Sequence, residues 1–421
     1  MPRRQGYGLL TALVAATAAL AAGAASAGSP FFSAPPPRPG HGSGAGAAAP
    51  AAVPADADGS WFGTWSAAPV AGATGARRGG ARSSRTVHNV VHTSVGGDAA
   101  RITLSNLFGT RPLLVDRAAV DARPVTFHGA ASVAIAAGGQ VVSDPVAVPV
   151  AADSDLVVTV RAPTAEGPVT AHPRSHQTSY VEEDGRRVRR TGDWLHLTAV
   201  DVHNATAAGT IAVIGDSLTA GTGSTTDANS RWPDVLADRL HGRYGVVNAG
   251  IAGNRLLRDG TGVRATARFD RDVLGVAGVR TVVVALGIND VQKYPQEADP
   301  RRIADALRSL TLRAHARGLR VVGATLMPYG GYPTWTPARD AVRERVNRLI
   351  RAGGIFDAVV DFDAAARDPH DPARLRPGYD SGDHLHLNDA GYRRLGSSAT
   401  WPDPAAMTAT PEHRQPVGGR F

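Results

Sequence analysis

The sequence predicts a parallel, doubly wound α/β sheet in its second half, preceded by an antiparallel β-sandwich. From residue 209 onward, short apolar runs alternate with segments whose apolar residues recur at helical spacing. Such alternation is typical of parallel strands joined by crossover helices. From residue 61 to about residue 204, apolar and polar residues alternate along short runs that glycine or proline separates, as in a sandwich.

Five strands and three helices are expected in the second half. The expected strands lie at 210–215, 245–250, 281–287, 319–326 and 358–362. Apolar residues at helical spacing predict helices at 232–240, 300–318 and 337–354. Pro233 is tolerated in the first turn of a helix, and Gly318 and Gly353 are expected to end the second and third helices.

The first half contains three clear strand patterns, at 86–95, 101–108 and 155–160. His88 and His92 lie four residues apart in the first of them. A strand places these residues at opposite ends of one face, and a metal site needs more ligands at usable spacing. We therefore interpret both histidines as structural.

The N-terminal residues resemble an export signal. Arg3 and Arg4 precede an apolar stretch, and the small residues "ASA" at 25–27 suit cleavage, so residues 1–27 are predicted to be a signal peptide of a secreted protein. The apolar stretch has roughly 14 residues, whereas a membrane span needs about 20, so no stable membrane span is expected. Residues 28–58 are rich in alanine, proline and glycine and are predicted to be a linker.

These patterns divide the rest of the chain into a sandwich domain at 59–205, an α/β domain at 206–400 and a tail at 401–421. After Tyr392 the sequence is interrupted by Gly396, Pro402, Pro404 and Pro411. The interruptions argue against an apolar helix closing the sheet, and they predict that the tail is disordered.

Composition excludes several classes of function. The chain has 421 residues, a formal net charge of +8 and no cysteine, so disulfides, thiolate zinc sites and cysteine nucleophiles are excluded. Its arginines are scattered, whereas a nucleic-acid-binding protein clusters them among aromatic residues, so no nucleic-acid partner is expected. The densest run, "GRRVRR" at 185–190, is interpreted as a solvated loop.

The stretch "AVIGDSLTAGTGS" at 212–224 ends a buried strand with a small hydroxyl residue, Ser217. Two interpretations compete: Ser217 caps the next helix, or it is a nucleophile at the end of the sheet. Asn248, Gly250 and Gly253 follow the second strand, and Asn289 follows the third. Ligands of such a sheet bind outside the carboxyl ends of its strands, so these residues are expected at one rim.

A serine nucleophile needs a base, and the base needs an orienting carboxylate. Asp383 and His386, in "SGDHLHLNDAGY" at 381–392, are three residues apart, so that one turn can bring them side by side. His384 is then expected to point elsewhere. The alternative is a D-H-x-H metal site, which lacks partner ligands and leaves the other strand ends unexplained. No metal and no cofactor are expected.

With these motifs in order, residues 209–395 resemble the SGNH, or GDSL-like, hydrolases, a family of esterases and acylhydrolases. The resemblance implies a flavodoxin-like sheet. It also implies that Ser217 is the nucleophile, with Asp383 and His386 completing a triad, and that Ser217, Gly253 and Asn289 form the oxyanion hole. The segment that opens with "TWSAAP" at 64–69 resembles the accessory domain of some secreted actinobacterial members.

The expected function is that of a secreted serine esterase that hydrolyses O-acyl esters through an acyl-enzyme. Acetyl groups on polysaccharides and small aryl or alkyl esters are the expected substrates. One alternative is a lipase or phospholipase, for which the aromatic loop at 327–337 would pack against acyl chains. The other is a carbohydrate-binding surface protein whose hydrolase domain is inactive.

Overall fold

The computed structural model describes residues 60–74, 85–163, 167–185 and 187–402. The predicted signal peptide, the predicted linker and residues 403–421 of the predicted tail lie outside this part of the chain. All described residues belong to one compact unit, Ala55–Phe421. None of the helices in the described ranges combines the length and the apolar character that a membrane span requires.

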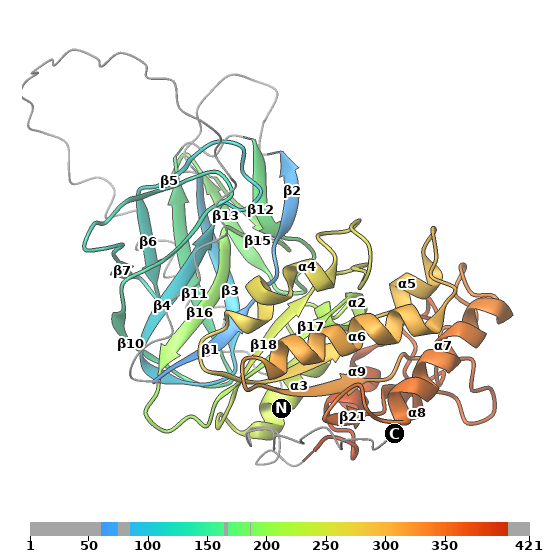
Figure 1. Ribbon diagram of the computed structural model, residues 1–421. Coiled ribbons are helices and arrows are strands. Elements are labelled where there is room, and N and C mark those ends of the chain that lie inside the picture. Colours follow the sequence, from blue (N-terminus) through green and yellow to red (C-terminus); the bar gives the residue numbers. More distant parts are fainter. Residues whose placement is uncertain (1–59, 75–84, 164–166, 186, 403–421) are drawn as a thin grey trace, which may run out of the picture. The chain divides into compact units, whose positions relative to one another are not determined.

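Five parallel strands form the sheet of the second half, in the order β18-β17-β19-β20-β21 (Figure 1). Their bounds are β17 (Thr210–Gly215), β18 (Gly245–Gly250), β19 (Val279–Ala285), β20 (Arg320–Ala324) and β21 (Ala358–Val360). Counted along the chain, the order is 2-1-3-4-5, which is the flavodoxin-like arrangement. The predicted fold class of this half is confirmed, and β17 and β18 have the predicted bounds.

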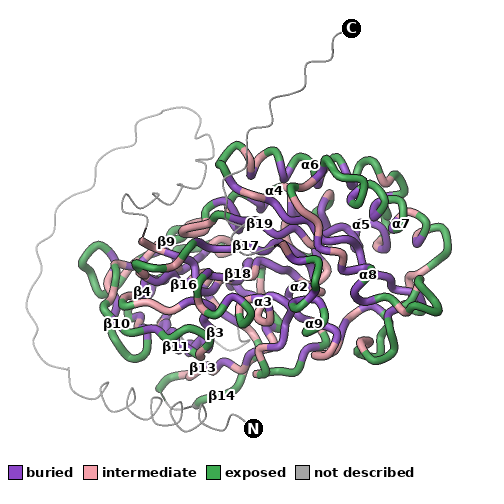
Figure 2. The backbone as a smooth tube through the Cα atoms, turned by 90° about the horizontal axis from the view of Figure 1, so that it is seen from below, coloured by how far each residue is buried: buried purple, intermediate pink, exposed green. Residues whose placement is uncertain are grey.

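Helices cover both faces of this sheet. They are α2 (Ser217–Ala220), α3 (Trp232–Leu240), α4 (Ala265–Phe269), the π-helical turn η1 (Asp270–Leu274), α5 (Ile288–Gln292), α6 (Pro300–His315), α7 (Pro337–Arg351), α8 (Phe362–Ala366) and α9 (Asp389–Gly396). Because side chains alternate along a strand, Ala212 and Ile214 pack in the core with α4, α6 and α7, whereas Ile211 and Val213 pack with α3, α8 and α9. Figure 2 shows the central strands largely buried and the outer helices with exposed turns.

Helix α9 corrects the prediction that no helix closes the sheet. Its Tyr392 and Leu395 are fully buried. Gly396 is a contact point, because a Cβ there would lie 2.5 Å from the Cβ of Val235 on α3. Trp401, assigned to the tail, is also buried, with its ring stacked on Trp232 at a centroid distance of 5.6 Å. The buried core therefore extends past Gly396 and reaches Trp401, directly before Pro402.

The first half is an antiparallel, strand-rich domain, as predicted. Its strands are β1 (Trp61–Ser66), β2 (Val70–Thr74), β3 (Arg85–Thr93), β4 (Gly97–Ser105), β5 (Leu113–Val115), β6 (Arg117–Val120), β7 (Arg123–Val125), β8 (Val133–Ile135), β9 (Gln140–Val142), β10 (Val146–Val150), β11 (Ser154–Ala162), β12 (Pro168–His172), β13 (Ser179–Glu183), β14 (Arg187–Thr191), β15 (Trp194–Leu195) and β16 (Leu197–His203). We call β1 to β16 the antiparallel region and β17 to α9 the parallel region.

Two sheets of the antiparallel region enclose one hydrophobic core. One sheet has the order β1-β16-β4-β10, with β9 also paired to β4, and the other has the order β14-β13-β3-β11-β6-β7. Ile102 and Val200 of the first sheet pack in the same cluster as Val91 and Val158 of the second. The run "GRRVRR" was expected to be a loop, but its residues from Arg187 onward belong to β14, at the edge of the second sheet.

The two regions are joined by direct hydrogen bonds. The Gly63 amide donates to Thr210 Oγ1 at 3.1 Å, and the Val246 amide donates to Ser94 Oγ at 2.8 Å. Ala67 also forms a parallel bridge with Asn248 of β18. The antiparallel region thus packs against the β18 edge of the parallel sheet, and the domain limits at 59–205 and 206–400 stay predictions.

Candidate active site

Ser217 is the first residue of α2, directly beyond the end of β17. Asp216 is the N-cap of this helix, because its side chain accepts a hydrogen bond from the Leu218 amide at 3.0 Å. The interpretation of Ser217 as the helix cap is therefore wrong. The turn before Ser217 requires glycine, since a Cβ on Gly215 would lie 2.0 Å from Thr219 Oγ1.

A chain of hydrogen bonds links Ser217 to an imidazole and a carboxylate. Nε2 of His386 lies 2.9 Å from Ser217 Oγ, and Nδ1 of His386 lies 2.5 Å from Asp383 Oδ2. An ionised carboxylate can only accept, so Nδ1 carries a proton and Nε2 is left to accept from the serine hydroxyl. The structure thus brings together the three residues predicted to form the triad.

Asp383 is held by its own turn. Its Oδ1 accepts hydrogen bonds from the backbone amides of Leu385 at 3.0 Å and His386 at 2.8 Å. Partial burial raises the pKa of Asp383, but the hydrogen bonds from the His386 ring and from these amides lower it by more. The pKa of Asp383 therefore lies below its ordinary value, and the carboxylate stays charged to stabilise a protonated imidazole.

His384 takes no part in the hydrogen bonds that link Ser217, His386 and Asp383, as expected. Its Nδ1 lies 2.6 Å from Asp380 Oδ2, and its φ of 69° turns the backbone into the left-handed region. The two histidines of the D-H-x-H motif therefore bond different carboxylates, His384 that of Asp380 and His386 that of Asp383. Within the described ranges, no group of three or more histidine and acidic side chains could hold a metal ion.

Asn289 and Gly253 follow the two strands that flank β17. Asn289 Oδ1 accepts from Gln292 Nε2 at 3.0 Å, and Asn289 Nδ2 donates to the Asn254 carbonyl at 3.0 Å, which fixes the carboxamide and leaves its second N–H proton. Gly253 has φ of 78°, a value that favours glycine. Neither the Gly253 amide nor the Ser217 amide donates to another described residue.

Two buried charged residues that the sequence did not single out hold these turns in place. Arg268 is fully buried and donates to the carbonyls of Gly215 at 3.1 Å and Ala249 at 2.7 Å, and to Asn254 Oδ1 at 3.1 Å. Asp290 accepts two backbone amides of the turn after β18. In the sequence, Asp290 is marked only by its place directly after Asn289, in "GIND" at 287–290, and nothing marks Arg268.

The antiparallel region contributes a loop to the rim of the site. The Asp227 carboxylate accepts from the amide of Thr178 at 2.5 Å and from its hydroxyl at 2.7 Å, while the Asp227 amide donates to the His176 carbonyl at 3.0 Å. Burial lowers the pKa of His176, and the charges of Arg231 and Arg174 lower it further. The charge of His386 lowers the pKa of His176 as well, so this loop is within electrostatic range of the triad histidine.

An apolar cluster lies beside the same residues. Its members are Ile288, Tyr329 and Leu385, with Leu218, Tyr332 and Trp335 packed against them. Three members directly precede or follow Ser217, Asn289 and His386 in the chain, so the cluster packs beside the backbone that carries the reacting groups. Burial and then the charge of Asp383 raise the pKa of Tyr332, which places its ring close to the triad carboxylate.

Comparison with known proteins gives one family and several solved structures. Residues 213–394 match the model of the GDSL-like Lipase/Acylhydrolase family. The similar structures include a carbohydrate acetylesterase from Sinorhizobium meliloti, with 16% identity and a TM-score of 0.37, covering 45% of this chain and 94% of that one. An aryl esterase from M. smegmatis has 19% identity and a TM-score of 0.37, with 45% of this chain and 94% of that one covered.

A GDSL-like lipase from Bacteroides thetaiotaomicron is similar at 18% identity and a TM-score of 0.35, with 45% of this chain and 84% of that chain covered. None of the curated proteins matches the chain. The TM-scores are too low for these structures to identify a substrate. The family match covers the strand end at Ser217, the turns at Gly253 and Asn289, and the Asp383–His386 pair. The segment 213–394 of this chain is therefore a domain of the GDSL-like lipase/acylhydrolase family.

Proposed function

We propose that the protein is a secreted serine esterase that hydrolyses carboxylic O-acyl esters through an acyl-enzyme. One observation carries the proposal: Ser217 Oγ lies 2.9 Å from His386 Nε2, whose other ring nitrogen lies on Asp383. This arrangement activates a hydroxyl as a nucleophile.

The proposed reaction has two halves. His386 Nε2 takes the proton of Ser217 Oγ as the oxygen attacks the ester carbonyl carbon, and the protonated His386 then gives that proton to the departing alcohol. Water, deprotonated by His386, attacks the acyl-enzyme and releases the acid and free Ser217. In both halves the amides of Ser217 and Gly253 and the second Asn289 N–H proton hold the oxyanion, where charge develops only in the transition state.

The apolar cluster supports a short acyl group. Ile288, Tyr329 and Leu385 are 2%, 0% and 2% exposed, so the cluster offers little open apolar surface for a long chain. Exposed large apolar side chains in the described ranges are Leu114, Val188, Tyr294, Leu312 and Leu349, and of these Tyr294 alone lines the cavity beside Gly253. A lipase-type entry face would need a larger apolar patch.

Secretion and the class of alcohol are further parts of the proposal. The basic and apolar pattern of residues 1–27 supports export. The loop of the antiparallel region that contains Thr178 is hydrogen-bonded to Asp227 of the parallel region. This contact supports a role for the antiparallel region in selecting large alcohols, such as acetylated polysaccharides. If the protein is exported as proposed, N-terminal sequencing of the extracellular protein begins after residue 27.

The test of the chemistry is Ser217→Ala in the full chain, assayed on 4-nitrophenyl acetate. Loss of the attacking oxygen is expected to lower kcat by about 10⁴-fold or more. An alkyl phosphonate ester should add covalently to Ser217 of the wild type, with a mass increase mapped to the peptide that contains it. Ser397→Ala is the matched control, because Ser397 is exposed and bonds only within α9. Unchanged turnover in Ser217→Ala contradicts the proposal.

A further inference from the structure

A basic cavity of about 520 Å³ opens beside the predicted oxyanion hole. Gly253 lies in its wall, and the side chains that the argument uses are Arg255, Arg258, Arg264, Lys293 and Tyr294. Lys293 is the only lysine of the chain and follows α5, the helix that carries Asn289. The cavity therefore borders the Gly253 turn, one of the turns that would hold the reacting carbonyl.

Two of the four cations in the wall are matched by carboxylates. Arg264 Nη1 lies 3.0 Å from Asp259 Oδ2, and Arg255 Nε lies 3.7 Å from Asp290 Oδ1.

The other two cations are unmatched. Lys293 Nζ donates to the Gly253 carbonyl at 3.0 Å and forms no ion pair with a described residue. Arg258 is exposed and likewise forms no ion pair with a described residue. Neither cation therefore has a carboxylate at ion-pair distance in the described ranges, and the buried Asp216 acts on Lys293 only from farther away.

Three charged residues near the cavity act on Lys293. Burial lowers the pKa of Lys293, and the charges of Arg255 and Arg174 lower it further, whereas the buried Asp216 raises it. Arg174 belongs to the loop of the antiparallel region that reaches the rim. Cations from both regions therefore act on Lys293. Their mutual repulsion favours the binding of an anion in the cavity.

We propose that this cavity binds an anionic group, such as a carboxylate, on the alcohol portion of the ester substrate, with Arg258 and Lys293 as its partners. The inference rests on the proposed esterase function and narrows its substrate to esters of acidic alcohols, of which acylated acidic sugars are one class. Arg258 is a specificity residue, because it distinguishes charged from neutral alcohols and takes no part in bond breaking.

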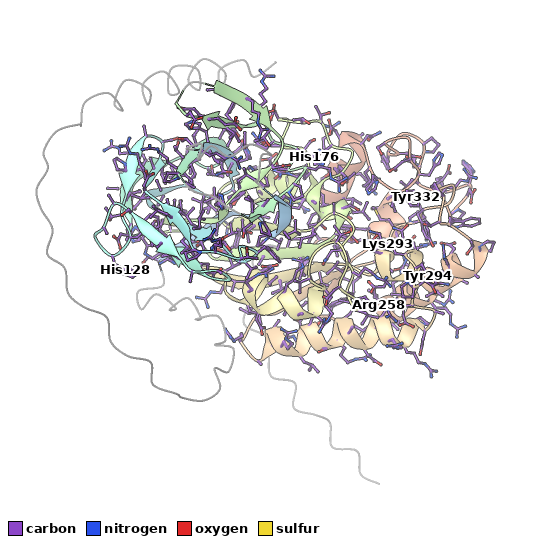
Figure 3. All side chains as sticks on the ribbon, turned by 90° about the horizontal axis from the view of Figure 1, so that it is seen from above. His128, His176, Arg258, Lys293, Tyr294 and Tyr332 are labelled. Atoms are coloured by element: carbon purple, nitrogen blue, oxygen red, sulfur yellow. The ribbon has the colours of Figure 1, made fainter. Side chains whose placement is uncertain are left out.

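The apolar cluster assigns the anion to the alcohol portion. The cluster suits the acyl group, and it contains Tyr332, whereas the cavity contains Arg258 and Lys293. In Figure 3 the labels of Tyr332 and Arg258 lie on opposite sides of Lys293. An ester whose acyl group contacts the cluster would then direct its alcohol toward the cavity.

The test compares two acetyl esters that differ in charge, 3-acetoxybenzoate and 3-acetoxybenzamide, with the full chain. The measured quantity is the ratio of kcat/KM for the charged ester to kcat/KM for the neutral ester. Removing a charge-assisted contact in Arg258→Gln is expected to lower this ratio by about tenfold. Arg317→Gln, which removes one exposed positive charge from the end of α6, is the matched control and should leave the ratio unchanged.

Salt and binding measurements separate the inference from the esterase proposal. Raising the salt from about 0.05 to about 0.5 M should reduce the wild-type preference, because screening shortens the Debye length. Calorimetric binding of the product 3-hydroxybenzoate should weaken about tenfold in Arg258→Gln, and this readout needs no turnover. If neither ester is cleaved but that binding depends on Arg258, the esterase proposal fails and the anion site stands.

Two outcomes overturn the inference. One is a ratio and a product affinity that Arg258→Gln leaves unchanged. The other is a charge effect confined to the acyl side, seen when 4-nitrophenyl hydrogen adipate responds to Arg258→Gln while the acetoxy pair does not.

Discussion

Two histidines, one from each region, have both ring nitrogens engaged, and their partners differ. In the antiparallel region, His92 Nδ1 lies 2.9 Å from Asp155 and Nε2 lies 3.0 Å from Asp153. Burial lowers the pKa of His92, but Asp155 and the other nearby carboxylates raise it by more. Two carboxylates around one ring favour its protonated form, which cannot accept a further proton.

In the parallel region, His386 has a carboxylate on one nitrogen and the Ser217 hydroxyl on the other. Replacing the second carboxylate by a hydroxyl gives the ring a partner that can donate its proton to the imidazole. The two histidines differ in the second partner of the ring, so a candidate site is recognised by the partners of a polar group as well as by the group itself. Pairs of substitutions, one in each region, test this difference.

The largest expected difference is between two buried asparagines. Asn289→Ala should lower kcat by about 10²–10³-fold, or about 3–4 kcal/mol, because it deletes a donor to charge that develops in the transition state. Its KM should move much less. Asn89→Ala in the antiparallel region removes both hydrogen bonds to the Leu195 backbone, so it should cost about 1–3 kcal/mol of unfolding free energy.

The measurements are kcat and KM on 4-nitrophenyl acetate and urea unfolding for both variants. Asn89→Ala should keep the wild-type kcat. A kcat loss of the same size in both variants would mean that the two regions do not divide catalysis and structure as described.

Next in size are opposite dependences of stability on pH. Burial lowers the pKa of His172 and of His196 to about 4, from 6.5, so the unfolded chain binds these protons first as the pH falls. Each histidine therefore removes up to about 3 kcal/mol of unfolding free energy between pH 6.5 and about pH 4. Both groups belong to the antiparallel region.

Asp216 of the parallel region has the opposite sign. Burial raises its pKa to about 7, from 3.8, so its contribution to stability is present below pH 3.8 and is lost as the pH rises toward about 7. Urea unfolding as a function of pH should show a smaller acid-side loss in His172→Gln and a smaller neutral-side loss in Asp216→Asn. Exposed His370→Gln is the control, and identical profiles for all four proteins would refute both assignments.

The smallest effect concerns the contact between the regions. Thr178→Val deletes one hydrogen bond to the Asp227 carboxylate and keeps the shape of the side chain, so it should cost about 1.5 kcal/mol of unfolding free energy. Thr198→Val, which deletes a longer bond at 3.3 Å to a neutral carbonyl, should cost less. Thermal unfolding ranks the two variants, and the reverse ranking would show that the rim loop is held by other contacts.

The parallel sheet and the Asp383–His386 pair were predictable because their signals are local. Apolar runs at strand length, glycines beyond each run and a three-residue spacing of carboxylate and imidazole are all visible within a few positions. The predicted helix at 232–240 has the same bounds as α3 for the same reason. The prediction that Ser217, Gly253 and Asn289 lie at one rim was possible because the carboxyl ends of neighbouring parallel strands share one edge of the sheet.

Other features depend on contacts between distant positions and could not be read from the sequence. Arg174 and Thr178 reach the rim from the antiparallel region, and no spacing rule connects them to Asp227. The prolines after Tyr392 suggested an early end to the fold, whereas the stacking of Trp401 on Trp232 joins residues far apart in the chain. Sequence pattern also cannot show which cations have a carboxylate partner. That Arg258 and Lys293 form no ion pair with a described residue could be seen only in the structure.

The single turn that holds Asp383 and His386 makes this pair a self-contained module. The Oγ–Nε2 contact, between residues 169 positions apart, is the one link of the triad that depends on tertiary structure. A small displacement of the turn would break the hydrogen bond between Ser217 and His386, so that Ser217 lost its base while the Asp383–His386 pair stayed intact. The low-field Nδ1 proton resonance of His386 therefore gauges the turn alone, and phosphonate reactivity of Ser217 gauges the assembled sheet, so the two signals together locate damage in any variant.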